Sequence, residues 1–134
     1  MTRINIIPPG DLYDQHLIAE YREMLMVPAS LKRTLASKLG LQLNKIPKRF
    51  TLNTGHVYFF YDKGLYLDKR YQSLIDEMIL RGFNPDSSRV FPTEIFKENN
   101  LYNDWTPSRK EQLLIKQRIT ERVNQRPGWY RKTK

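Results

Sequence analysis

The sequence contains no cysteine, and this absence removes several kinds of chemistry at once. Disulfides, zinc–thiolate sites and thiol nucleophiles are all excluded from a chain of 134 residues. Long hydrophobic runs are also missing, since no apolar stretch approaches the roughly 20 residues that span a bilayer. The N-terminus lacks the apolar stretch of a signal peptide. We therefore expect a soluble, cytoplasmic protein whose chemistry comes from oxygen and nitrogen atoms.

Acidic side chains are in the minority, with 14 against 23 basic ones and a formal net charge of +9. The excess is concentrated in two segments. Residues 107–134 hold nine basic and two acidic side chains, and residues 36–63 hold five and one. Such a surface favours a polyanionic partner, although a solvated basic surface without a partner has the same composition.

The apolar residues recur with helical spacing, which predicts an all-α fold in one domain over residues 1–134, with about three or four helices. The first helix follows Pro8-Pro9-Gly10, and Asp11 or Asp14 is its expected N-cap. One face of this helix is apolar. The opposite face carries Gln15, His16, Glu20, Arg22 and Glu23.

Three further segments are predicted to be helical. Pro28 begins the second helix and Gly40 ends it, because proline suits a first turn and glycine a C-terminus. The third spans roughly residues 64–81. A capping box of Ser108 and Glu111 begins the last helix, whose expected buried stripe consists of Leu113, Leu114, Ile115, Ile119 and Val123.

Long irregular connections separate these helices. Residues 44–57 are expected to form a basic loop, and the apolar run at residues 57–61 is interpreted as the buried start of the third helix. By periodicity alone that run could be a strand, but a sheet needs partner strands. Residues 83–106 form a long connection of a kind that is uncommon unless it is functional or packed by its own side chains.

The polar face of the first helix offers two kinds of site. His16, Glu20 and Glu23 have a spacing that a metal ion could use, but too few other ligands accompany them, and we expect no metal and no cofactor. Glu20 and Glu23 could also act as paired carboxylates, although neighbouring acids are common on exposed helices.

Thr2 is a less conspicuous candidate. Initiator methionine is usually removed before a small residue, which would leave threonine with a free α-amine. The reference pKa of an α-amine is about 7.7–8.0 against about 10.4 for lysine, so more of it is neutral and nucleophilic at pH 7. The charges of Arg3 and Arg22 would lower that pKa further.

The C-terminal segment combines aromatic and basic residues. Trp129 and Tyr130 could stack on bases, or they could anchor the chain end to the core. Arg118 and Arg122 are spaced for one helical face, as phosphate contacts require, and solvated arginines have the same spacing.

Five blocks of the sequence resemble the pyrimidine-dimer DNA glycosylases of phage and algal-virus type. They occur in the same order along the chain and comprise Met1-Thr2-Arg3-Ile4-Asn5, residues 14–23, residues 55–63, Arg81-Gly82-Phe83 and residues 125–130. Met26 departs from the pattern, because the best-known phage member has a phosphate-binding arginine there. Lys32 or Arg33 would have to replace that phosphate contact.

The resemblance implies a monomeric viral or bacterial repair enzyme that acts on double-stranded DNA with pyrimidine dimers or abasic sites. It implies that the amine of Thr2 attacks the sugar C1′ to form an imine, and that Glu23 is the catalytic carboxylate for base release and β-elimination. DNA-binding roles are implied for Arg3, Gln15, His16, Arg22, Arg118 and Arg122. The rival interpretations are a non-enzymatic DNA-binding protein and a metal-dependent nuclease.

Overall fold

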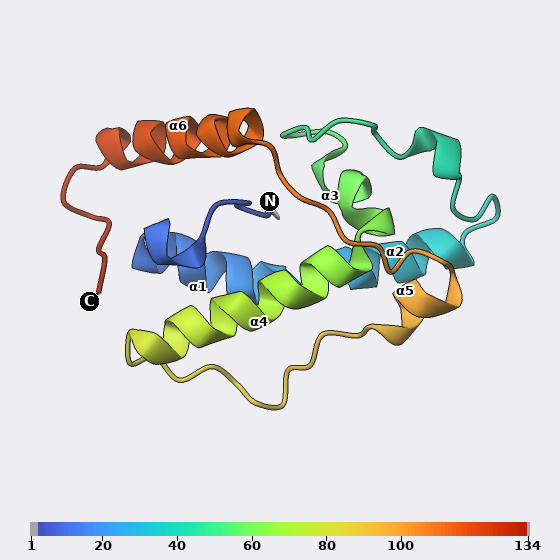
Figure 1. Ribbon diagram of the computed structural model, residues 1–134, viewed down its shortest axis with the longest axis horizontal. Helices are drawn as coiled ribbons and strands as arrows, with labels where there is room; N and C mark the ends of the chain where they lie inside the picture. The colour runs from blue at the N-terminus through green and yellow to red at the C-terminus, as the bar shows by residue number, and fades with distance from the viewer. Residues whose placement is uncertain (1–2, 134) are drawn as a thin grey trace.

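The computed structural model describes residues 3–133, and these residues form helices and loops without a strand (Figure 1). Four helices have ten or more residues: α1 (Asp14–Glu23), α2 (Met26–Ala36), α4 (Gly64–Leu80) and α6 (Arg109–Gln125). The shorter elements are α3 (His56–Phe59), α5 (Glu94–Glu98) and the 3-10 turns η1 (Pro9–Asp11), η2 (Leu43–Lys45) and η3 (Phe60–Asp62). The expected all-α fold with three or four main helices is confirmed.

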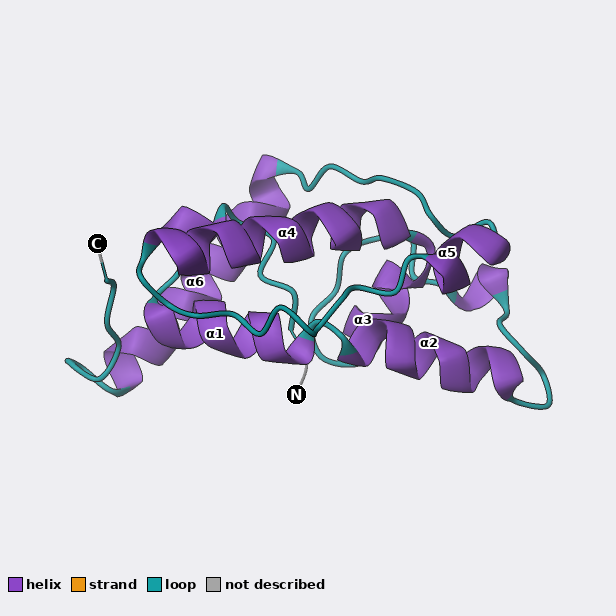
Figure 2. Ribbon diagram, turned by 90° about the horizontal axis from the view of Figure 1, so that it is seen from below, coloured by secondary structure: helices purple, strands orange, loops and turns teal. Residues whose placement is uncertain are grey.

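The main helices surround a short N-terminal arm, residues 3–8. Helices α1 and α2 follow one another nearly in line, and α4 lies alongside α1 (Figure 2). The arm runs between α1 and α6 (Figure 1), and the side-chain amide of Gln112 on α6 donates to the carbonyl of Ile6 at 3.1 Å. Ile4, Ile6 and Ile7 are buried. The N-terminal arm is therefore built into the core.

Helix α1 begins without the expected side-chain cap. Tyr13 is its N-cap residue and forms no capping hydrogen bond. Asp14 lies inside the first turn, where its carboxylate accepts hydrogen bonds from the guanidinium of Arg81 at 2.8 Å and from the backbone N–H of Thr133 at 3.0 Å. The prediction of Asp11 or Asp14 as N-cap is wrong, because the carboxylate of Asp14 binds more distant parts of the chain.

Helix α2 is shorter at its C-terminus than the sequence predicts. It begins at Met26, two residues before Pro28. The first N–H groups of a helix have no partner within the helix, so a proline in the first turn removes no helical hydrogen bond. Helix α2 ends at Ala36, and the hydroxyl of Ser37 donates to the carbonyl of Thr34 at 2.6 Å. Leu39, three residues beyond the helix end, is 75% exposed.

The capping box that starts α6 is confirmed, with Ser108 and Glu111 bonding reciprocally. Its buried stripe is narrower than predicted. Ile115 and Ile119 are buried, whereas Leu113 and Leu114 are 55% and 41% exposed. The helix packs along a single row at i, i+4 spacing, and the two leucines lie outside that row.

The aromatic run at residues 57–61 is helical, as α3 and η3, and the long connection at residues 83–106 includes the single turn of α5. Phe91, Phe96 and Leu101 bury that connection against the core, so it is packed by its own side chains. A Cβ atom on Gly64 would lie 2.5 Å from the ring of Phe96. The start of α4 therefore needs a glycine.

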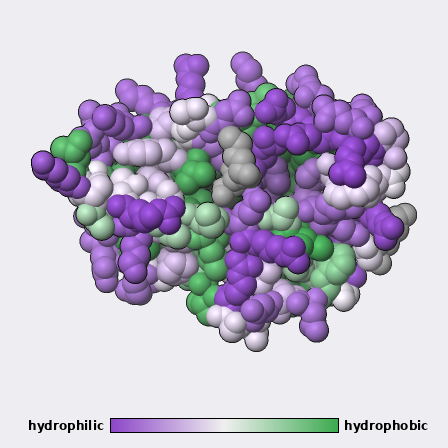
Figure 3. Space-filling view, turned by 180° about the vertical axis from the view of Figure 1, so that it is seen from behind, coloured by the Kyte–Doolittle hydropathy of each residue, from purple (hydrophilic) through white to green (hydrophobic). Residues whose placement is uncertain are grey.

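The outer surface agrees with the charge balance of the sequence. Hydrophilic residues cover most of the face shown in Figure 3, and hydrophobic ones appear there only in small separate patches. Within residues 3–133, every helix is too short or too polar to cross a membrane.

Candidate active site

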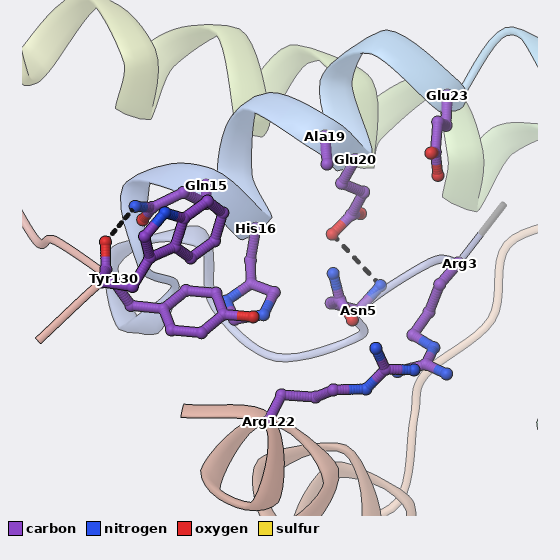
Figure 4. Close-up of a pocket in the computed structure, with 10 residues that line it drawn as sticks. Arg3, Asn5, Gln15, His16, Ala19, Glu20, Glu23, Arg122 and Tyr130 are labelled. Carbon is purple, nitrogen blue, oxygen red and sulfur yellow. Dashed lines mark hydrogen bonds between the residues drawn. The ribbon is translucent and has the colours of Figure 1, made fainter. Parts of the chain in front are cut away.

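A cavity of about 330 Å³ lies where the N-terminal arm, α1, α6 and the C-terminal tail meet. The tail is defined here as residues 126–133. Figure 4 shows ten residues that line the cavity: Arg3, Asn5, Gln15, His16, Ala19, Glu20, Glu23, Arg122, Trp129 and Tyr130. Ala19 is exposed on α1 between the larger side chains, so that a ligand can approach the helix closely at this point.

Five of the residues predicted to act on DNA line this cavity, namely Arg3, Gln15, His16, Glu23 and Arg122. Two others have different positions. Arg118 lies on α6 near Arg3, and Arg22 lines a second cavity beside Ile18, Phe83 and Arg89. Thr2 lies outside the described residues, but it is bonded to Arg3.

Positive charge gathers at the mouth of the cavity. The side chains of Arg3 and Arg122 extend toward one another (Figure 4). Partial burial lowers the pKa of Arg3, as do the charges of Arg118 and Arg122, while Glu23 raises it. Three guanidinium groups crowded in this way repel one another and would be relieved by an anionic ligand.

Glu23 is near the end of α1 and is half-buried. Its carboxylate points from the helix toward the arm, close to the point where the side chain of Arg3 branches from the arm (Figure 4). A carboxylate at this position faces both the described beginning of the arm at Arg3 and the cationic mouth of the cavity. It can stabilise a positive charge that develops inside, and it can accept a proton.

His16 forms part of the cavity wall with Tyr130, whose ring stacks on the imidazole at 4.8 Å between centroids. Burial lowers the pKa of His16, and the charges of Arg3 and Arg122 lower it further. The imidazole is therefore neutral at pH 7. Among residues 3–133, no atom forms a hydrogen bond with its buried Nδ1.

The tail is held on the first turn of α1 by hydrogen bonds. The side-chain amide of Gln15 donates to the carbonyl of Trp129 at 2.7 Å and accepts from the N–H of Arg131 at 3.0 Å. The N–H of Asp14 donates to the carbonyl of Arg131 at 2.6 Å. Of the two sequence-based alternatives, Tyr130 anchors the tail, while Trp129 remains 45% exposed with the guanidinium of Arg126 over its ring.

Glu20 does not lie on the solvent face to which the helical pattern assigned it. Its side chain is fully buried, and its carboxylate accepts from Nε and Nη2 of Arg70 at 2.7 and 3.0 Å and from the N–H of Asn5 at 3.1 Å. The sequence assignment is wrong because a partner on α4 compensates the charge inside the core. Glu20 therefore cannot pair freely with Glu23, and residues 3–133 contain no cluster of three potential metal-ligating carboxylate or imidazole side chains.

Sequence reasoning missed two residues that bind the arm. Arg70 donates to the carbonyls of Asn5 and Ile7 in addition to its pairing with Glu20. His56 accepts a hydrogen bond from the N–H of Ile4. The sequence does contain one sign of the role of Arg70. This charged residue interrupts the apolar stripe of α4 between Leu67 and Leu74, where a buried side chain is expected.

The comparison with known families agrees with this arrangement. A model of the pyrimidine dimer DNA glycosylase family matches residues 1–90, which is more than half of the chain. The matched range includes the arm, α1 with Glu23, and α4 with Arg70. The resemblance noted in the sequence is thus confirmed, and the chain belongs to the pyrimidine dimer DNA glycosylase family.

Proposed function

We propose that this protein excises cyclobutane pyrimidine dimers through an imine formed by its N-terminal amine, and that it then cuts the strand as an AP lyase. The observation that carries the proposal is the position of Arg3 and Glu23. The residue that would supply the amine is bonded to Arg3, and Arg3 and Glu23 line one cavity whose mouth is cationic. A nucleophile, a carboxylate and a phosphate-binding region would then meet within one small volume.

In the glycosylase step, the neutral α-amine of Thr2 attacks C1′ of the 5′ nucleotide of the dimer. The C1′–N bond to the base breaks, and its electron pair leaves with the base. Positive charge develops on the sugar, and the carboxylate of the half-buried Glu23 stabilises it. The attacking nitrogen then gives up one proton, its lone pair breaks the C1′–O4′ bond, and O4′ takes up a proton as the sugar ring opens to the protonated imine.

In the lyase step, the imine makes the C2′ hydrogen acidic. Glu23 accepts that proton, the electrons form the C2′–C3′ double bond, and the 3′ phosphate leaves with the electrons of its C3′–O bond. Water then hydrolyses the imine and regenerates the amine. Each step uses atoms of the chain, the DNA and water, so no cofactor is required.

The arginines at the cavity mouth would bind the DNA backbone. Arg3, Arg118 and Arg122 lie close enough for their charges to affect one another, and nearby DNA phosphates would neutralise them. The exposed ring of Trp129 offers a stacking surface beside the same cavity. Gln15 and His16 would contact the DNA from the first turn of α1, next to the tail.

The test is borohydride trapping on ultraviolet-irradiated duplex DNA in excess EDTA. We expect a covalent protein–DNA adduct with the mature chain and none with unirradiated duplex. A non-enzymatic DNA-binding protein would bind without forming an adduct, and a metal-dependent nuclease would cut only when EDTA is omitted. Mass spectrometry of the adduct should locate the bond on residue 2, and a bond to a lysine would contradict the proposal.

A further inference from the structure

The N-terminal arm is bound by polar side chains from four different helices. The carbonyls of Asn5, Ile6 and Ile7 accept hydrogen bonds from Arg70 of α4 and Gln112 of α6. Two amides of the arm, those of Ile4 and Asn5, are also bonded. The N–H of Asn5 donates to Glu20 of α1 at 3.1 Å, and the N–H of Ile4 donates to Nε2 of His56 on α3 at 2.8 Å. His56 therefore holds the first amide of this set.

The imidazole of His56 is fixed on both sides. Its side chain is buried, with the residue 3% exposed, and the rings of Phe50 and Phe60 approach it edge-on with centroids at 5.4 Å. Nδ1 is 2.8 Å from the carbonyl of Thr51, so it must donate a proton there. With that proton on Nδ1, Nε2 carries a lone pair and accepts from Ile4. Only the neutral ring satisfies both bonds.

We propose that His56 is a positioning residue for the amine, and that its neutral ring fixes the start of the chain against Glu23 by holding the N–H of Ile4. This inference rests on the proposed function. Ile4 is two residues from Thr2, and a chain extends by at most about 3.6 Å per residue. The chain between Ile4 and the amine of Thr2 therefore spans at most about 7 Å, so that an arm released at Ile4 no longer holds the amine in place. A shift of about 1 Å at a reacting group can cost roughly 100-fold in rate.

The surroundings of His56 set the pH range in which this contact exists. Burial lowers the pKa of His56, and the charge of Arg3 on the arm lowers it further, while the hydrogen bond to Thr51 opposes both. The other titratable groups that line the cavity beside it are Lys45 of η2, Tyr58 of α3 and Tyr61 of η3.

The sign of the effect follows from this lowered pKa. The released imidazole has a pKa near 6.5 and binds a proton more readily than the imidazole bonded to Ile4. The stabilisation that this contact supplies is thus fully present above about pH 6.5 and declines progressively as the pH falls from there through the lowered pKa of His56. A protonated ring would point an N–H at the N–H of Ile4, and the arm would be released.

Two substitutions at His56 separate positioning from packing. His56→Leu keeps apolar bulk but removes the acceptor, and His56→Gln supplies a carbonyl oxygen near Nε2 that cannot be protonated. The measurement is the single-turnover rate of borohydride-trapped adduct on an abasic-site duplex at saturating protein, from pH 5.5 to 8. At pH 8 we expect His56→Leu to lose roughly tenfold or more in rate with DNA affinity unchanged, and His56→Gln to recover most of it.

The pH profile supplies a readout that a purely structural role would not change. Below pH 6.5 the rate of His56→Gln divided by that of the wild type should rise as the pH falls, because only the wild type loses the contact. Phe96→Leu is the matched control, since it removes a buried ring that contacts Phe91 and Gly64. It should lower the melting temperature without changing the pH profile.

Hydrogen exchange at the amide of Ile4 measures the hydrogen bond to His56 directly, and this measurement does not depend on catalysis. Exchange should accelerate in His56→Leu and stay slow in His56→Gln. A His56→Leu protein that is folded and traps DNA at the wild-type rate would overturn the inference while leaving the proposed function intact. If that variant does not fold, a flat ratio between His56→Gln and the wild type would overturn it instead. Failure of the wild type to form any adduct would overturn the proposed function, and this inference with it.

Discussion

Replacing Glu20 by glutamine should destabilise the entire fold, although the change removes only one charge. The side chains of Arg70 and Glu20 are 6% and 0% exposed, so the guanidinium cannot regain solvent when its partner is lost. Glutamine has a single acceptor oxygen, and its NH₂ group would face one of the guanidinium donors. Removing one partner of a buried pair costs roughly 3–5 kcal/mol, because the remaining charge stays buried without compensation.

This cost should be visible as a large fall in melting temperature. For a domain of this size, 1 kcal/mol corresponds to roughly 4 °C, so Glu20→Gln should melt about 12–20 °C below the wild type. Differential scanning calorimetry at pH 7 measures the shift directly. The matched control is Asp104→Asn, which breaks an exposed ion pair with Lys69. The side chains of Asp104 and Lys69 are 46% and 62% exposed. An exposed ion pair contributes little to stability, so the melting temperature of the control should fall by no more than a few degrees.

A second substitution distinguishes the lost charge from lost packing. Glu20→Leu combined with Arg70→Met replaces the buried pair by apolar side chains, an exchange that is often neutral in stability. Here it should restore only part of the loss, since the N–H of Asn5 and the carbonyls of Asn5 and Ile7 would lose their partners. If Glu20→Gln melts within about 4 °C of the wild type, the pair does not hold the arm in the way described.

Three further predictions concern the proposed reaction. Glu23→Gln should lower the single-turnover glycosylase rate by roughly two orders of magnitude or more while binding of irradiated duplex survives, and only a mild loss would remove Glu23 from the mechanism. An extra residue before Thr2, such as a retained initiator methionine, should abolish adduct formation by displacing the amine, and full activity with an uncleaved tag would contradict the role of Thr2. Arg118→Ala combined with Arg122→Ala should lower the slope of log affinity against log salt by about two for undamaged duplex, and an unchanged slope would mean that neither side chain contacts a phosphate.

The main helices and one face of the site could be predicted because both depend on local spacing. Apolar residues three and four apart define α1, and the same spacing gathers Gln15, His16 and Glu23 on the opposite side. The capping box of α6 is equally local, with Ser108 and Glu111 three residues apart. Contacts within one helical turn involve residues three or four positions apart, so they can be recognised in the sequence. The polar face of α1 and the capping box of α6 are both contacts of this kind.

The buried polar contacts could not be predicted, since their partners are far apart in the sequence. Glu20 and Arg70 are separated by 50 positions, and Ile4 and His56 by 52. Helical periodicity assigns a charged residue to the solvent side unless its partner is known. The pattern therefore predicts an exposed Glu20 that is available to a metal ion, whereas in the structure Glu20 pairs with Arg70 inside the core.

Helix α1 also shows how residues that hold the fold and residues that line the cavity alternate along one short element. Its first turn binds the tail through Asp14 and Gln15, its middle binds the arm and α4 through Glu20, and its end presents Glu23 to the cavity. One helix thus sets the distance between the arm and the tail, which line the same cavity. Because both groups of the Gln15 amide are bonded to the tail, any ligand that reaches Gln15 must compete with those bonds. The width of the cavity at that end consequently depends on how firmly the tail is held.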